Sequence, residues 1–168
     1  MMAEQRAVID TEQSSRYVCL SLGRQALLLP QHDIRTLESV LDVSIEGRPV
    51  NGVGWLRFEK GRWPVYCCNE ELQPLPVMPL QQRICALLTC ASGYFGLICA
   101  NVATVPGAQL RIRPLAAAMA RPHSPLYGLT LYHGRVGLVS TAAHLAVLLQ
   151  AEAAIRQQAA SGRQADHG

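Results

Sequence analysis

The chain has 168 residues, enough for one compact domain or for two small ones that share a core. Hydrophobic residues make up 49% of the sequence and charged residues 16%, which excludes a disordered chain for most of its length. The formal net charge of +3 comes from 15 basic and 12 acidic residues that are dispersed along the chain, so the sequence lacks the basic run typical of nucleic-acid binding.

The N-terminal segment is polar and carries acidic residues before any apolar run, which is not the order of an export signal. We expect residues 1–15 to be flexible. The apolar runs are the length of strands and fall short of the ~18 residues that a membrane-spanning helix needs. The sequence therefore predicts a cytoplasmic protein without membrane insertion.

Four pairs of apolar segments are each joined by a short connection that contains glycine. These pairs are 17–22 with 25–30, 52–58 with 62–68, 83–90 with 94–100, and 126–132 with 135–140. Gly23, Gly61, Gly93 and Gly134 are expected to supply the positive φ that tight turns between strands require. The pattern predicts four β-hairpins, and the run 27–29 of three leucines indicates a strand that is covered on both faces.

A connector with three prolines, residues 73–79, separates the first two hairpins from the last two. We therefore predict a first half at about 16–72, completed by returning segments, and a second half at about 83–140. Two small sheets that close or nearly close would hide their hydrogen-bonding edges.

The C-terminal part of the chain has helical periodicity after Ser140. Leu145, Leu148, Leu149 and Ile155 recur at the spacing of one helix face, which predicts a helix over 141–158. The remaining residues, 159–168, are small and polar, and we expect them to form a flexible tail.

The six cysteines lack the closely spaced pairs of a zinc site, and they all fall in predicted strands. They are Cys19, Cys67, Cys68, Cys85, Cys90 and Cys99. A free cysteine in a strand usually behaves as a small buried apolar group. Since no nucleophile, phosphate-binding loop or paired histidine motif accompanies them, the sequence predicts no catalytic residue, no metal site and no cofactor.

Two tryptophans flank a charged residue in the second predicted hairpin. Trp55, Trp63 and Arg57 are of the residue types enriched at binding hot spots, because they combine a large contact area with a polar group. Core packing beside Pro64 is the alternative interpretation for Trp63.

The second hairpin also resembles a known signature. The segment 50–57, VNGVGWLR, followed by WPV at 63–65, resembles CheW-like domains, in which an apolar-x-Gly-Val segment leads to Leu-Arg-Gly and then to Pro-Val. Phe58 stands where that family usually has glycine after the arginine, which indicates a divergent member.

Three other stretches agree with the family in order along the chain, and the match spans residues 16–150. They are the opening hairpin and crossover at 17–37, the hairpin and following segment at 96–105, and the closing hairpin and helix at 126–149. The resemblance implies a mainly β fold of two small five-stranded β-barrels packed together, with a C-terminal α-helix.

The resemblance also implies a function. CheW-like proteins are non-catalytic adaptors that bind the regulatory domain of a CheA-type histidine kinase and the cytoplasmic tip of a chemoreceptor. Family analogy places the receptor groove between the barrels, close to Ile34, Leu37, Val53, Leu56 and Arg57. Arg57 is then expected to hold a receptor carboxylate or backbone carbonyl.

Two alternatives remain open at this stage. One keeps the fold and makes the chain a scaffold in a pilus or second-messenger pathway without kinase contact. The other is a β-barrel that binds a small molecule or uses its thiols, which a cysteine of lowered pKa would favour.

Overall fold

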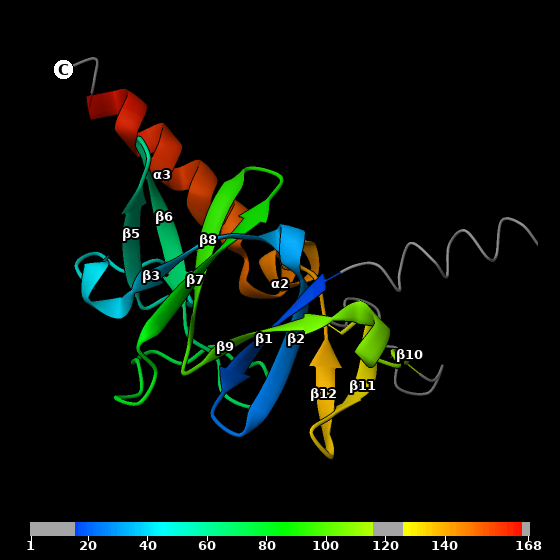
Figure 1. Ribbon diagram of the computed structural model, residues 1–168. Coiled ribbons are helices and arrows are strands. Elements are labelled where there is room, and N and C mark those ends of the chain that lie inside the picture. The colour runs from blue at the N-terminus through cyan, green and yellow to red at the C-terminus, as the bar shows by residue number, and fades with distance from the viewer. Residues whose placement is uncertain (1–15, 116–125, 166–168) are drawn as a thin grey trace, which may run out of the picture.

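The computed structural model describes residues 16–115 and 126–165, with side chains as far as Arg163 (Figure 1). The flexible N-terminus expected over residues 1–15 lies outside these ranges.

Within the described residues the chain forms twelve strands in two sheets of six, so the predicted mainly β class is confirmed. The first sheet has the order β10-β11-β12-β2-β1-β9 and the second the order β3-β7-β8-β6-β5-β4. The strands of the first sheet are β1 (Arg16–Leu22), β2 (Gln25–Pro30), β9 (Val102–Pro106), β10 (Arg113–Pro114), β11 (Gly128–Tyr132) and β12 (Arg135–Val139). Those of the second are β3 (Ile34–Ser39), β4 (Val43–Ser44), β5 (Gly54–Phe58), β6 (Gly61–Tyr66), β7 (Ile84–Cys90) and β8 (Gly93–Cys99). Each sheet thus has five longer strands, as the barrel prediction requires, and one strand of two residues.

The four predicted hairpins are confirmed as the antiparallel pairs β1–β2, β5–β6, β7–β8 and β11–β12. Gly23, Gly93 and Gly134 adopt positive φ, as expected. In the β5–β6 turn the positive φ belongs to Glu59 (56°), and the prediction for Gly61 is wrong. Gly61 has a different role, because a Cβ there would collide with the ring of Trp63.

The two sheets do not coincide with the halves expected at about 16–72 and 83–140. Hairpins β1–β2 and β11–β12 share the first sheet, where β12 pairs in parallel with β2, and hairpins β5–β6 and β7–β8 share the second. The chain leaves the first sheet after β2 through the 3-10 turn η1 (Gln31–Asp33) and returns to it with β9. The connector at 73–79 therefore lies within the part of the chain that builds the second sheet.

The largest buried cluster joins both sheets and the helix α2 (Ala142–Leu149). Leu27 and Leu29 belong to this cluster, whereas Leu28 belongs to a separate cluster of the first sheet with Tyr17 and Val139. All three leucines are fully buried, so the predicted covering of this strand on both faces is confirmed. Figure 1 shows α2 between the two sheets.

The helix predicted over 141–158 is divided into α2 and α3 (Ala151–Ala165). Thr141 caps α2 by accepting from the His144 amide, and Asp33 Oδ2 accepts from the Ala142 amide at 2.8 Å. Gln150 ends α2 in the left-handed conformation with φ 57°, which redirects the chain into α3. Because α3 continues to Ala165, the prediction of a flexible tail from residue 159 is wrong up to that residue.

Candidate partner-binding surface

The five predicted site residues lie in three different environments. Val53 is 3% exposed and Leu56 is 1% exposed, and both belong to a cluster of buried residues from the second sheet. Ile34 is half-buried against the central cluster, whereas Leu37 is 47% exposed and Arg57 is exposed. Leu37, Arg57 and part of Ile34 are thus available to a partner. Val53, although largely buried, contributes to the lining of a pocket that also includes Arg48. Leu56 can act only by shaping the strands around it.

The outer face of the β5–β6 hairpin holds two arginines opposite each other in register, Arg57 and Arg62. Arg62 is fixed, because its guanidinium lies 4.7 Å from the centre of the Trp55 ring and donates to the Glu46 carbonyl at 3.2 Å. Arg57 makes no hydrogen bond or ion pair with any described residue. The tryptophan–arginine pair of this hairpin is therefore Trp55 with Arg62, and Arg57 keeps its donors available.

The tip of the hairpin is held by an aromatic cluster of Phe58, Trp63 and Tyr94. Tyr94 lies edge-on to both other rings, at centroid distances of 5.6 and 5.0 Å, and Trp63 Nε1 donates to the Phe58 carbonyl at 3.1 Å. Trp63 is half-buried: it packs against the buried cluster of the second sheet, in agreement with the core-packing interpretation, and it also lines a pocket beside α3. Phe58 gives the hairpin tip an apolar base, because its ring packs edge-on against Tyr94.

A cation from β3 connects that strand to the hairpin tip. Arg35 lies 5.3 Å from the centre of the Phe58 ring and forms an ion pair of 3.1 Å with Glu59. Both partners of the ion pair are about half exposed, so the pair orients the tip more than it stabilises the fold.

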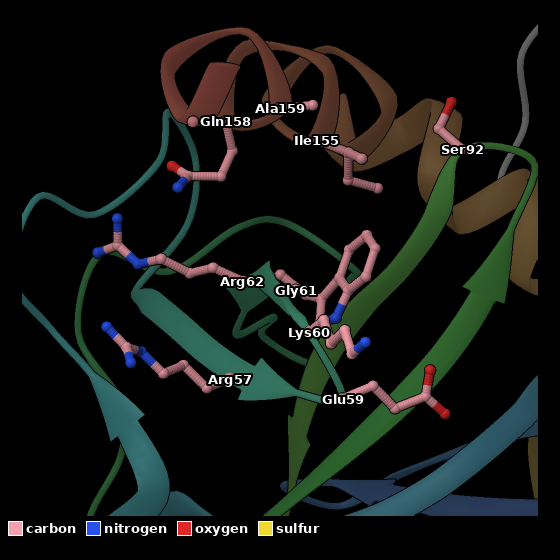
Figure 2. Close-up of a pocket in the computed structure, with 11 residues that line it drawn as sticks. Arg57, Glu59, Lys60, Gly61, Arg62, Ser92, Ile155, Gln158 and Ala159 are labelled. Atoms are coloured by element: carbon pink, nitrogen blue, oxygen red, sulfur yellow. The ribbon is translucent and has the colours of Figure 1, made fainter. Parts of the chain in front are cut away.

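A pocket of about 620 Å³ separates the hairpin from α3 (Figure 2). Its lining comprises Arg57, Glu59, Lys60, Gly61, Arg62, Trp63, Ser92, Ile155, Gln158, Ala159 and Gly162. In Figure 2, Arg57 and Arg62 extend to the same side of the hairpin, and Ile155 and Gln158 approach it from α3. The lining has three basic side chains and one acidic one, Glu59, which is already paired with Arg35.

Of the predicted site residues only Arg57 lines this pocket, and sequence reasoning missed the contribution of α3. The signal was present, since residues 155, 158, 159 and 162 follow the i, i+3, i+4, i+7 spacing of one helix face. It was weak because the residues at these positions are mostly small or polar.

The sequence also gave no indication of an apolar surface around the β4 edge. Two of its exposed side chains are Ile45 and Val77. Ile45 and Val77 line a pocket of about 680 Å³ with Arg48 as its charged member.

The six cysteines are free thiols, of which five are buried and Cys90 is half-buried. Burial raises the pKa of Cys67 to about 11 and the pKa values of Cys68, Cys85 and Cys99 to about 12. The Cys67 thiol lies 3.2 Å from Gln82 Oε1, to which it donates. These thiols stay protonated near neutral pH, which disfavours the thiol-dependent alternative.

The buried thiols predict that the protein loses stability above about pH 9. The unfolded chain releases thiol protons near the ordinary value of 9.0, whereas the folded chain holds them to about 11 or 12. The folded state therefore binds more protons in this interval, and the loss is on the order of 1 kcal/mol for each thiol at about pH 10. Thermal melting between pH 8 and 10 measures the decline. A Cys68→Ala variant should show a shallower decline, and a melting temperature that is constant over this interval would contradict the prediction.

No group of three or more histidine, cysteine or acidic side chains in the described ranges is arranged to hold a metal ion. Among residues 16–115 and 126–165, no helix has the length and apolar character needed to cross a membrane.

Comparison with known proteins identifies the fold. No protein-family model matches the chain, and no curated protein matches it in sequence. Among solved structures, the chain is similar to the scaffolding protein TtCheW from Thermoanaerobacter tengcongensis, with a TM-score of 0.62 and 17% sequence identity. The similarity covers 79% of this chain and 92% of that chain. The chain thus has the CheW-like fold, as the resemblance at residues 50–65 predicted.

Proposed function

We propose that this protein is a non-catalytic adaptor that couples a chemoreceptor to a CheA-type histidine kinase in the cytoplasm. The observation that carries the proposal is the match of the fold to a scaffolding protein over most of both chains. The resemblance at 50–65 supports it independently, because that segment forms the β5–β6 hairpin from which Arg57 projects.

The receptor-binding surface in this proposal consists of Ile34, Leu37 and Arg57. Leu37 supplies exposed apolar area, and the guanidinium of Arg57 has donors free to bind a carboxylate or a backbone carbonyl. Val53 and Leu56 support this surface from the interior of the second sheet.

An adaptor of this kind changes kinase activity only if it binds one kinase state more tightly than the other. Coupling energies between sites are typically about 1–3 kcal/mol, which a few contacts at each surface can supply. The central cluster, which joins both sheets, would then connect the receptor contact to the rest of the molecule, where the kinase binds.

A second candidate is a scaffold with the same fold that does not contact a kinase, in a pilus or second-messenger pathway. The observation that favours it is the departure at Phe58, whose packing against Tyr94 and Arg35 gives the hairpin tip a shape that the family's glycine would not give.

Binding measurements with purified partners test the proposal. Leu37→Asp and Arg57→Ala should each weaken binding of the receptor's cytoplasmic tip by about tenfold or more, because each removes a central contact. Leu131→Asp and Arg135→Ala, on the β11–β12 hairpin of the first sheet, are matched controls that should bind normally. Receptor binding that survives both test substitutions would remove the proposed surface. Receptor binding without binding of the kinase regulatory domain would favour the second candidate.

A further inference from the structure

We propose that α3 and the β5–β6 hairpin together form a docking groove for an acidic amphipathic helix of a partner protein. The inference rests on the proposed function in one respect, namely that Arg57 contacts a partner. It adds a second wall to that contact, formed by α3, of which the sequence had assigned only the part from residue 159 onward to a flexible tail.

The shape of the groove follows from how α3 is attached. Ala151, Ala154 and Ile155 are buried where the helix packs against the second sheet, but from Arg156 onward the described side chains are exposed or half-buried. The helix therefore continues past its own contacts and runs beside the hairpin tip (Figure 1). Ala159 and Gly162 are small, which leaves about 620 Å³ between the two elements.

The wall supplied by α3 suits a helical occupant. Ile155, Gln158, Ala159 and Gly162 form one row over about 10 Å of the helix axis. A second helix packs into such a row through its own i, i+3 and i+4 side chains. The half-buried Trp63 ring, on the hairpin side of the groove, provides apolar surface for those side chains, and Ile155 adds only the small part of its side chain that remains exposed.

The charges of the groove identify the chemistry of the occupant. Arg57 and Lys60 make no ion pair with a described residue, and Arg62 is bonded to a neutral carbonyl. The groove's acid, Glu59, is neutralised by Arg35. The lining thus has uncompensated positive charge, which attracts glutamate or aspartate side chains.

A second copy of this chain does not fit the groove by charge. The chain is itself basic, with a net charge of +3. The described part of α3 has one acid, Glu152, against Arg156 and Arg163, and that acid already accepts from the Ser92 amide. A different protein with an acidic helix meets the requirement better.

The test uses the full chain and fluorescent helical peptides held by a side-chain staple. One peptide has leucines at i, i+3, i+4 and i+7 flanked by glutamates, and the second has lysines in place of the glutamates. Anisotropy titrations should show that the acidic peptide binds at least about tenfold tighter than the basic one. Equal affinities would overturn the proposal.

Two substitutions locate the site. Lys60→Glu should weaken binding of the acidic peptide about tenfold by reversing a rim charge, and Arg135→Glu is its control on the first sheet. Gly162→Trp should block the groove, since a Cβ at this position meets open space into which the ring can extend. Ser161→Trp is its control, because it places the same bulk elsewhere on the helix, outside the pocket lining. If Gly162→Trp binds the acidic peptide normally, the groove is not the site.

Two further outcomes separate this inference from its rivals. A labelled single-stranded DNA that binds as tightly as the acidic peptide, and is unaffected by Gly162→Trp, would replace the inference with a general polyanion surface. If Gly162→Trp leaves binding of both the acidic peptide and the receptor tip unchanged, the groove inference fails and the adaptor role stands. If the peptide binds while neither receptor nor kinase does, the groove stands and the adaptor role fails.

Discussion

Leu56→Asp is expected to unfold most of the protein at room temperature, whereas Leu37→Asp should leave its stability nearly unchanged. Leu56 is 1% exposed and lies in the cluster inside the second sheet, and Leu37 is 47% exposed. Removing a buried leucine side chain typically costs about 2–5 kcal/mol, and an unpartnered carboxylate in the same place adds several more. The sum approaches the whole stability of a typical domain, about 5–15 kcal/mol.

Urea denaturation followed by tryptophan fluorescence measures both variants against the unchanged protein. Trp55 and Trp63 lie on the hairpin that contains Leu56, so the signal reports on the affected element. A midpoint for Leu56→Asp within error of the unchanged protein would show that Leu56 is not in the core. Because Leu56→Asp acts on folding, loss of partner binding in this variant would not identify a contact surface.

The sequence predicted the parts of the fold that depend on neighbouring residues. The four hairpins follow from alternating apolar residues and from turn chemistry, both of which act over fewer than ten residues. The distribution of hairpins between sheets depends on pairings such as Leu138 with Leu27, which are separated by more than a hundred residues and have no local signal. The connector at 73–79 was therefore a poor guide to the sheet boundary.

The break between the two C-terminal helices also could not be predicted from neighbouring residues. Gln150 adopts the left-handed conformation that glycine or asparagine usually supplies at the end of a helix. The cost of that conformation is offset by burial of Leu149 and Ala151 on either side of it. Tertiary packing thus selected a conformation that the residue type does not favour.

The binding surface was predictable in part. The resemblance placed Arg57 on the second hairpin, and the structure leaves its guanidinium exposed. It also selected Leu56, directly before Arg57, and Val53, four residues before it, and both side chains are buried. Three consecutive buried residues, Gly54 to Leu56, hide the alternation that would have separated inward from outward positions.

Gly93→Ala is expected to destabilise the protein much more than Gly134→Ala, although both glycines have positive φ in hairpin turns. An alanine at positive φ costs about 1–2 kcal/mol, and nothing lies within 4 Å of a Cβ at Gly134. A Cβ at Gly93 would also overlap the six-membered ring of Trp63, and such overpacking adds about 1–3 kcal/mol. Free energies of unfolding for the two variants, measured by chemical denaturation, give the difference directly.

A double-mutant cycle assigns that difference to the tryptophan. In a Trp63→Leu background the ring is absent, so Gly93→Ala should cost about 1–2 kcal/mol less than it does beside the intact ring, and the cost that remains is that of the backbone at φ 143°. The same ring is held by Tyr94 and by its bond to the Phe58 carbonyl, and it forms one side of the groove beside α3. If Gly93→Ala costs the same in both backgrounds, the ring does not rest on this turn. A coupling of the expected size would establish that the turns of two separate hairpins jointly position the Trp63 ring in the groove.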